Sequence, residues 1–393
     1  MKKEKKVNLM YTLIQAFFWS NAAVIFTYAV FYLQNAGCSK SGIGLTVSAA
    51  NIVSIFLSLN LSTAIDKRNG KNIFGIVNVL LLSQVFLQLF LMTINDSSIF
   101  TAIAYSLVMC LSLAINPVYT KLFINSSLHN LSINYSIARS VGSLAFAVTS
   151  FLTGKLISEV NVSPFHVICL ICLVLQITLT ARLRKEYNGT ELSKTNETDA
   201  DSLLSFIRGN PHLLVLFIGI ALIFSANHTI GTFLFSIVEN IGGSVTELGF
   251  LNGFMVLFET AAMFVYGKIQ IKNVKKVLIF SIMFFPVKII LTSVAHSTQG
   301  LFFAAAFQAL SFGLYTPAIV DYLNKTTERR NSAKSQTLAL NMQTIGTVIA
   351  TTISGYFLDI YDLENVLFGL STVSIIGVCV CLLSFRIKLR RMN

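Results

Sequence analysis

Charged residues are scarce in this chain of 393 residues. Only 12% of the residues are Asp, Glu, Lys or Arg, whereas about a quarter is usual in soluble proteins, and 54% are hydrophobic. The mean hydropathy is +0.72. So little charge excludes an ordinary soluble domain as the bulk of the chain, and the composition indicates a protein embedded in a lipid bilayer.

Motifs for several chemistries are also missing. The sequence has no phosphate-binding glycine loop, zinc-ligand cluster or nucleophile elbow, which excludes an ATP-driven pump and a metal-dependent membrane hydrolase. We therefore expect no enzyme activity, no metal and no cofactor, so that any transport draws on a gradient. The six cysteines lie in or beside apolar runs and predict neither a disulfide framework nor a zinc site; they are Cys38, Cys110, Cys169, Cys172, Cys379 and Cys381.

Apolar runs of about 20 residues, long enough to cross a bilayer, recur along the whole chain. Divided at its charged and turn-forming interruptions, the sequence predicts an all-α membrane protein with twelve transmembrane helices. The first run is too long for the apolar core of a secretory signal, about 7 to 15 residues, and is interpreted as a span. The predicted spans are 8–33, 42–64, 72–94, 99–120, 134–157, 163–184, 212–236, 246–267, 275–296, 299–323, 334–358 and 364–385.

The basic residues are distributed unevenly between the two sides of this topology. With both termini on one side, 25 of the 29 lysines and arginines lie on that side. Lys40 and Lys155 lie on the other side, and Arg139 and Lys288 lie within spans. Because short cytoplasmic loops retain Lys and Arg, we predict cytoplasmic termini and a multi-pass protein of the cell (inner or plasma) membrane. The net charge of +12 is thus topological, and nucleic acid is not an expected partner.

A polar, acidic segment divides the spans into two sets of six. Residues 186–201 are poor in aromatics and cannot bury a core, so the sequence predicts a flexible linker there. The predicted domains are an N-terminal six-helix bundle at 1–185, a cytoplasmic linker at 186–210 and a C-terminal six-helix bundle at 211–393. We expect a monomer.

The two sets of spans repeat one another in sequence. Ser39, Ile43 and Gly44 match residues 205 positions later, and so do Lys67 and Lys71. Two repeats that enter the membrane in the same sense predict pseudo-symmetric halves with a cavity between them, an architecture for alternating access. The matched residues are Ser244, Leu248, Gly249, Lys272 and Lys276, together with Pro117 and Pro317, and Gly154 and Gly355.

Glu259 and Lys288 are predicted to lie near the middle of the membrane. An ionisable side chain there costs about 2.5 to 3.5 kcal/mol on insertion scales and is a functional candidate by default. Lys288 follows Pro286, which opens the backbone ladder of its helix. A Glu259–Lys288 pair is either a permanent structural ion pair or a proton-coupling site, in which protonation of Glu259 gates the conformational switch.

Other polar or aromatic side chains within spans are candidates for substrate binding. Arg139 either binds a substrate oxygen or extends toward the cytoplasm, and Phe146, on the same helical face, either stacks on a ligand or packs. Trp19 is expected to pack. The remaining candidates offer donors and acceptors in mid-membrane, with helix–helix hydrogen bonding as the alternative; they are Asn21, Asn227, His228, Gln308 and Asn341.

The loop after the second predicted span carries a specific resemblance. Asp66-Lys67-Arg68-x-Gly70-Lys71 resembles the Asp-[Arg/Lys]-x-Gly-[Arg/Lys] signature of the major facilitator superfamily, with one additional residue before the glycine. In that family this loop latches the two halves on the cytoplasmic side, so Asp66, Lys67, Arg68, Gly70 and Lys71 are candidates for a cytoplasmic gate.

Within this superfamily the chain resembles the lactose-permease type of oligosaccharide:proton symporter. Ala138-Arg139-x-x-Gly142 is similar to the motif whose arginine binds the sugar, Phe146 takes the place of the stacking tryptophan, and Lys288 resembles an arginine of the proton-coupling network. Three positions depart from the family: Lys121 replaces the galactoside-binding glutamate, and Gln308 and Ser311 replace the histidine and glutamate of the proton carrier. Glu259 lies about one turn from the family's glutamate of the eighth span and is expected to take over its role.

The resulting hypothesis is a proton-coupled importer of a small polar solute such as an oligosaccharide or glycoside. A second hypothesis is export of amphipathic compounds, motivated by 32 phenylalanines. A third is a receptor or membrane enzyme without transport activity, but no loop is long enough to hold a signalling or catalytic domain.

Overall fold

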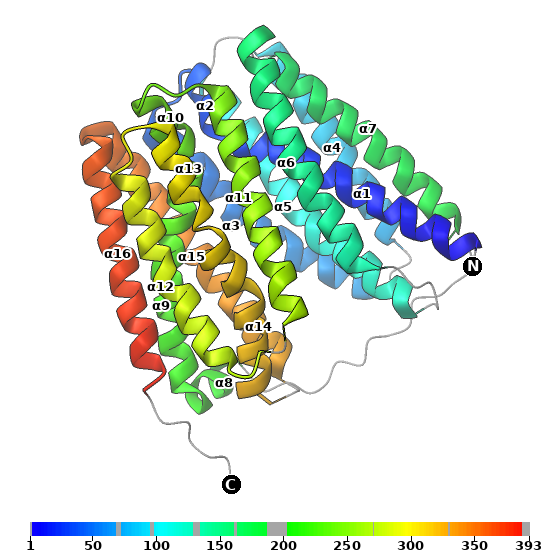
Figure 1. Ribbon diagram of the computed structural model, residues 1–393. Coiled ribbons are helices and arrows are strands. Elements are labelled where there is room, and N and C mark those ends of the chain that lie inside the picture. Colours follow the sequence, from blue (N-terminus) through cyan, green and yellow to red (C-terminus); the bar gives the residue numbers. More distant parts are fainter. Residues whose placement is uncertain are drawn as a thin grey trace. The chain divides into compact units, whose positions relative to one another are not determined.

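The computed structural model describes residues 2–67, 72–94, 98–128, 134–160, 163–186, 203–269, 271–328 and 331–386, and over these ranges the chain is helical without a strand (Figure 1). The helices are α1 (Lys2–Thr27), α2 (Ala29–Asn35), α3 (Lys40–Lys67), α4 (Ile73–Thr93), α5 (Ser98–Leu128), α6 (Tyr135–Val160), α7 (Ser163–Glu186), α8 (Leu203–Gly209), α9 (Pro211–Thr232), α10 (Leu234–Asn240), α11 (Val245–Lys268), α12 (Val274–Ser293), α13 (Thr298–Ala306), the π-helix η1 (Ala309–Gly313), α14 (Leu314–Thr326), α15 (Ser332–Ile360) and α16 (Leu363–Ser384).

Every predicted span overlaps a long helix or a helix with a short interruption. Three spans are interrupted, and they correspond to α1 with α2, α9 with α10, and α13 with η1 and α14. Ten of the described helices are long and apolar enough to cross a membrane. The long helices α12 and α15 fall outside this set of ten. The all-helical membrane fold is confirmed, whereas the count of twelve spans and the cytoplasmic termini stay predictions.

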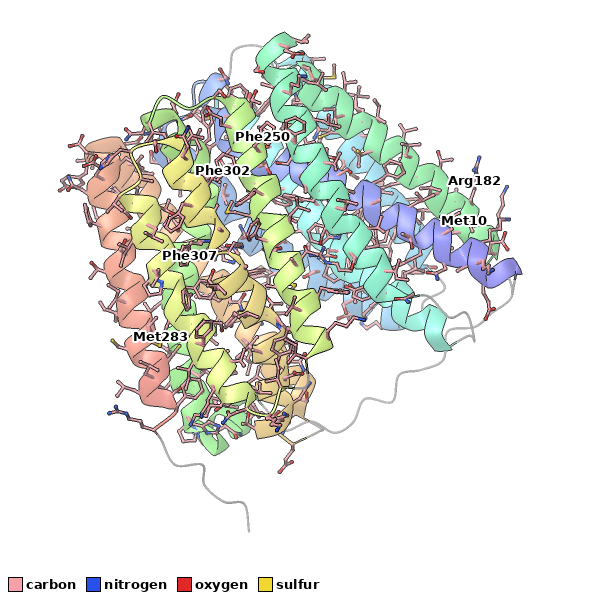
Figure 2. All side chains as sticks on the ribbon, in the orientation of Figure 1. Met10, Arg182, Phe250, Met283, Phe302 and Phe307 are labelled. Atoms are coloured by element: carbon pink, nitrogen blue, oxygen red, sulfur yellow. The ribbon has the colours of Figure 1, made fainter. Side chains whose placement is uncertain are left out.

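Large apolar side chains are widely exposed on the helices. Phe86 is 68% exposed, Phe264 is 66% exposed, and Met283, on α12, is 51% exposed (Figure 2). Water would penalise so large an apolar surface, and lipid does not, because the cost of exposed apolar area arises from contact with water. These outward faces are the ones that contact the bilayer.

The chain divides by its contacts into two compact units. Unit 1 is Met1–Thr195 with Ser244–Gly253, and unit 2 is Asn196–Gly243 with Phe254–Asn393. Of the predicted linker, residues 187–202 lie outside the described residues, and α8 lies in the rest. The domain boundaries at 1–185 and 211–393 stay a prediction.

Unit 1 is built around α1. This helix packs on α6 and α7, while α3 and α4 pack on α5 (Figure 1). The core of the unit is formed by the apolar face of α1, including Tyr11, Ile14 and Phe18, against residues of α4, α5 and α7.

Unit 2 is built around α9, which packs on both α15 and α16. The α9–α16 crossing is close because two glycines face one another there. A Cβ atom on Gly377 would lie 2.9 Å from the carbonyl oxygen of Gly219, and a Cβ atom on Gly219 would lie 2.8 Å from the carbonyl oxygen of Gly377. Such distances are shorter than van der Waals contact, so only glycine permits the two backbones to approach in this way.

The sequence repeat has a counterpart in the backbone of the two units. The helices α2 and α10 begin and end 205 residues apart, and each is followed by a left-handed glycine, Gly37 with φ of 79° and Gly242 with φ of 75°. These glycines end their helices in a conformation that other residues adopt only with strain. After each glycine a serine hydroxyl accepts a backbone N–H at the start of the next helix, from Gly42 to Ser39 at 3.1 Å and from Glu247 to Ser244 at 3.3 Å.

The glycine pair at the α9–α16 crossing generates a stability prediction. We expect Gly377→Leu to destabilise the protein by about 1 to 3 kcal/mol, because the added side chain overpacks the crossing. The thermal midpoint of unfolding in detergent is the measurement. Gly369→Ala is the matched control on the same helix, because a Cβ at Gly369 meets no atom within 4 Å. Equal midpoints for the two variants would contradict the close crossing.

Candidate functional site

A chain of polar side chains crosses the interior of unit 2, and Lys288 on α12 is at its centre. Lys288 is only 6% exposed. Its Nζ donates hydrogen bonds of 2.7 Å to Oδ1 of Asn227 on α9 and of 2.7 Å to Oε1 of Gln308. An isolated ammonium is costly to bury. The partial negative charges of these two amide oxygens stabilise the Lys288 ammonium in the interior of unit 2.

Gln308 links this lysine to the acid of the neighbouring helix. Its Nε2 donates a hydrogen bond of 2.9 Å to Oε2 of Glu259 on α11. The amide thus presents its oxygen to the ammonium and its N–H to the carboxylate, which is the orientation that both charges favour. The sequence predicted a Glu259–Lys288 pair, and the structure places Gln308 as a bridge between the two.

The local backbone explains how Gln308 reaches both partners. Gln308 immediately precedes the π-helix η1, a wider turn that interrupts the helix formed by α13 and α14. A Cβ atom on Gly313, at the end of η1, would lie 3.0 Å from Cα of Glu259 and 2.8 Å from Cβ of Ala262. The glycine therefore brings this turn against α11 at the level of Glu259. Single π turns inside helices occur frequently at functional sites.

Aromatic rings surround the same segment. The ring of Phe307, next to Gln308, stacks on Phe284 with centroids 5.9 Å apart, and Phe302 meets Phe254 edge-on at 5.4 Å (Figure 2). Apolar rings on these helices lower the local dielectric, which strengthens each electrostatic contact in the chain of polar groups.

The other two candidates of unit 2 are not members of this hydrogen-bonded chain. His228 follows Asn227 on α9, has an exposed side chain, and its ring lies 5.3 Å from the ring of Phe224. Asn341 is half-buried on α15. The structure assigns neither of them a hydrogen bond to Lys288, Gln308 or Glu259 among the contacts of the described residues.

In unit 1, Arg139 on α6 lies over an aromatic ring. Its guanidinium carbon is 3.9 Å from the centroid of Trp19 on α1, and its Nη1 donates a hydrogen bond of 2.7 Å to Oγ of Ser143. The Trp19 ring packs against Gly142, where a Cβ would clash with it. Packing was expected for Trp19, but its contact with Arg139 was not. Phe146 is half-buried two turns further along α6.

Asn21 belongs to a different network in unit 1. It is 3% exposed, and its Nδ2 donates a hydrogen bond of 3.2 Å to Oε1 of Gln84 on α4, which also accepts one of 3.2 Å from Ser112 on α5. One turn further along α4, Oε1 of Gln88 lies 2.8 Å from Nδ1 of His166 on α7. Sequence reasoning missed Gln84, Gln88 and His166, although two glutamines one turn apart in a predicted span were a visible signal.

The two networks use corresponding helices but carry different charge. Asn21 and Gln84 lie on the first and third long helices of the N-terminal half, as Asn227 and Lys288 do in the C-terminal half. The first network consists of amides and a hydroxyl, whereas the second contains an ammonium and a carboxylate. Of these two networks, only the one in unit 2 contains charged groups.

The predicted cytoplasmic gate is described only in part. Asp66 and Lys67 form the end of α3, and the side chain of Lys67 is exposed. Arg68, Gly70 and Lys71 lie outside the described residues. Nearby, Nζ of Lys121 on α5 donates a hydrogen bond of 3.2 Å to the carbonyl oxygen of Ser62 on α3. Within the described part of the chain, no three His, Cys, Asp or Glu side chains gather as the ligands of a metal ion would.

Comparison with protein families gives one match over nearly the whole chain. The model of the MFS_1 like family matches residues 9–385. A search of curated protein sequences finds no match.

Several solved structures with a similar fold are transporters. A mutant of the nucleoside transporter NupG has a TM-score of 0.78 and 13% identity, covering 98% of this chain and 100% of that one. A bacterial homologue of the human lysosomal transporter Spinster has a TM-score of 0.73 and 13% identity, covering 99% and 98%. A bacterial homologue of the iron transporter ferroportin has a TM-score of 0.72 and 14% identity, covering 98% of each chain. At these identities the likeness concerns the fold alone.

The bridge at Gln308 generates a double-mutant prediction. We expect Gln308→Leu to destabilise the protein by about 1 to 3 kcal/mol, because the buried Lys288 loses a hydrogen-bond acceptor. In a Lys288→Met background the same change costs less, since the buried charge that needs the acceptor is gone, and the coupling is expected to be about 0.5 to 3 kcal/mol.

The thermal midpoints of the four proteins in detergent measure this coupling. Gln343→Leu is the matched control, because Gln343 donates its hydrogen bond of 3.1 Å to Tyr315 instead. Its effect should add to that of Lys288→Met. If the effects of Gln308→Leu and Lys288→Met simply add, the two side chains are not energetically coupled, and the bridge is contradicted.

Proposed function

Because the chain belongs to the MFS_1 like family, we propose that it is a secondary active transporter that carries a small polar solute together with protons by alternating access. The single observation that carries the proton role is the Glu259–Gln308–Lys288 chain in unit 2. Twelve spans, cytoplasmic termini, a monomeric state and a place in the cell membrane are parts of the same proposal.

Glu259 is the proton-binding group in this proposal. Its carboxyl group changes charge when it binds or releases a proton, and Oε2 accepts the hydrogen bond from Gln308 that connects this change to Lys288. When Glu259 binds a proton, the carboxylate that Gln308 connects to Lys288 loses its charge. The ammonium then needs another electron-rich group, and an oxygen of the solute provides it.

The geometry of Lys288 supports this coupling. Asn227 and Gln308 accept two hydrogen bonds from Nζ, and an ammonium donates three. A third acceptor on the solute completes the shell in the protonated state of Glu259. Binding of proton and solute then favour one another, which is the requirement for symport.

The solute class is proposed from the polar groups of each unit taken by itself. In unit 1, Arg139 offers planar donors next to the Trp19 ring, which suits hydroxyl groups on a ring with an apolar face. In unit 2, Asn227 and Gln308 offer amides beside Lys288, which suit hydroxyl groups as well. Oligosaccharides and other glycosides have this chemistry. Nucleosides are glycosides as well, and a nucleoside transporter is among the structures with a similar fold.

Export of amphipathic compounds is the second candidate. The aromatic rings near Gln308, which include Phe254, Phe284, Phe302 and Phe307, favour it, because apolar rings bind flat apolar ligands. Drug susceptibility of a deletion strain distinguishes the two functions, since loss of an importer leaves susceptibility unchanged and loss of an exporter raises it.

Proton coupling is tested with purified protein in lipid vesicles. A thermal-shift screen against sugars, nucleosides and organic acids first identifies a solute that stabilises the protein. We then expect an imposed inward proton gradient to drive accumulation of that solute. Glu259→Gln should abolish accumulation, because glutamine binds no proton at the pH of the assay. Exchange of labelled for unlabelled solute across the membrane should survive in Glu259→Gln.

Glu239→Gln is the matched control, because Glu239 is an exposed carboxylate on α10 of the same unit. It should accumulate solute as the wild type does. Uptake that ignores the pH gradient in the wild type, or accumulation by Glu259→Gln at the wild-type level, would refute the proton role.

A further inference from the structure

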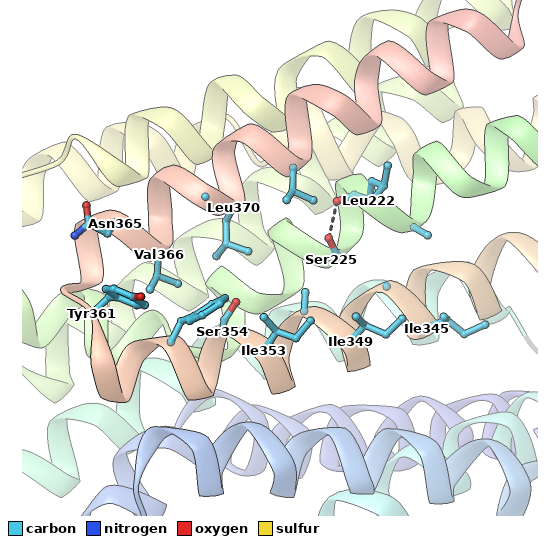
Figure 3. A pocket seen from close by; sticks show the side chains of 16 residues that line it. Leu222, Ser225, Ile345, Ile349, Ile353, Ser354, Tyr361, Asn365, Val366 and Leu370 are labelled. Atoms are coloured by element: carbon cyan, nitrogen blue, oxygen red, sulfur yellow. Dashed lines mark hydrogen bonds between the residues drawn. The ribbon is translucent and has the colours of Figure 1, made fainter.

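An apolar groove lies within unit 2, between α15 and α16, with α9 as its floor (Figure 3). Its volume is about 720 Å³, within the range of about 300 to 1,000 Å³ that is usual for ligand sites. No lining side chain is charged. None of the polar groups of the candidate transport site, Asn227, Glu259, Lys288 and Gln308, lines this groove.

The groove is longer than one leaflet of a bilayer is deep. Its lining extends along α15 from Ile345 to Tyr361, which is about 24 Å at the rise of an α-helix. The hydrocarbon core of a bilayer is about 30 Å thick, so one leaflet contributes about 15 Å. An acyl chain that enters beside Tyr361 thus finds apolar contact over its full depth in the leaflet.

Aromatic side chains place the Tyr361 end of the groove at the membrane surface. Tyr361 is 56% exposed and lies 5.7 Å from the ring of Phe357, which in turn lies 6.0 Å from Tyr356. Tyrosines gather where the hydrocarbon meets the headgroups, because the ring is apolar and the hydroxyl is polar. A lipid in the groove would have its headgroup at this end.

The turn at this end is acidic. Asp359, Asp362 and Glu364 are exposed there, and no lysine or arginine occurs between Lys334 and Arg386. Asp362 is the N-cap residue of α16, but its side chain makes no capping hydrogen bond. The carboxylates therefore form a negative rim beside the mouth of an uncharged groove.

We propose that this groove binds one acyl chain of a phospholipid whose headgroup carries an ammonium group, such as phosphatidylethanolamine. The chain lies along Ile349, Ile353 and Leu370, and the ammonium lies against the carboxylates of Asp362 and Glu364. Anionic lipids such as phosphatidylglycerol are disfavoured, because their headgroups meet the same carboxylates without a compensating positive charge.

Gly369→Leu is the variant that fills the groove. Gly369 lines the groove, and a Cβ there meets no atom within 4 Å, so leucine occupies the space that the acyl chain would take without disturbing the helix packing. Gly75→Leu on α4 is the matched control, because a Cβ there also meets no atom within 4 Å and the residue is far from the groove in sequence and lies in unit 1.

Native mass spectrometry of the protein, delipidated and returned to mixed micelles with phosphatidylethanolamine and phosphatidylglycerol of identical chains, measures retained lipid. We expect the wild type and Gly75→Leu to retain one phosphatidylethanolamine with a preference of about tenfold over phosphatidylglycerol. Gly369→Leu should lose the retained lipid. Asp362→Asn combined with Glu364→Gln should retain lipid but lose the preference.

The acyl-chain site and the headgroup selection are tested independently. Retention by Gly369→Leu at the wild-type level would show that the acyl chain binds elsewhere. Retention by the wild type without headgroup preference, or an unchanged preference in the double charge variant, would show that the acidic rim selects no headgroup. Because the charge variant changes only exposed side chains, the headgroup arm can be read even if Gly369→Leu fails to fold.

Discussion

The burial of the Lys288 ammonium between the helices of unit 2 is the interaction on which the rest of the structure depends. A positive charge in that place is stable only if neighbouring helices supply electron-rich groups, and three of them do so: α9 through Asn227, the segment before η1 through Gln308, and α11 through Glu259 by way of Gln308. The π turn and Gly313 follow from this requirement, since they bring the amide of Gln308 between α11 and α12. One buried charge thus fixes the mutual positions of four helical segments.

The internal repeat shows why such a site distinguishes one unit from the other. Both units end their first helix pair with a left-handed glycine and begin the next helix with a serine, at positions 205 residues apart. Backbone geometry has therefore been kept in both copies. The polar networks on the corresponding helices differ between the units. In unit 1 the network consists of the amides of Asn21 and Gln84 and one hydroxyl group, whereas in unit 2 it contains an ammonium and a carboxylate. A division of labour, with the proton chemistry in unit 2, is the consequence that we propose.

Much of the fold was predictable because lipid imposes simple rules on a sequence. Each predicted span overlaps a long helix or an interrupted one. In lipid the backbone N–H and C=O groups of about 20 apolar residues find no water to bond, and a helix pairs them within the segment. The interruptions were not predictable. Tyr28 separates α1 from α2 within an apolar run that contains no glycine or proline. Phe233, which separates α9 from α10, follows Gly231 by two residues, but Gly219 within α9 causes no such break. Such breaks result from tertiary packing, which hydrophobicity does not report.

The candidate site was predictable in its members but not in its connections. Glu259 and Lys288 were visible as charges within apolar runs. Three contacts depend on how each helix is rotated and how closely the helices approach, which no periodicity or motif in the sequence indicates. They are the position of Gln308 between Glu259 and Lys288, the stacking of Arg139 on Trp19, and the hydrogen bond from Asn21 to Gln84. The selection of Asn21 and Asn341 as substrate-binding residues stays a prediction for the same reason.

The most direct measurement of the central claim is an infrared titration of the protein in lipid, which follows the carbonyl band of protonated carboxyl groups as the pH is changed. We predict a titrating band that is absent from Glu259→Gln, and whose midpoint pH changes in Lys288→Met because a nearby charge is lost. Identical titrations of the wild type and Glu259→Gln would contradict the account, because a carboxyl group that binds no proton cannot couple protons to transport.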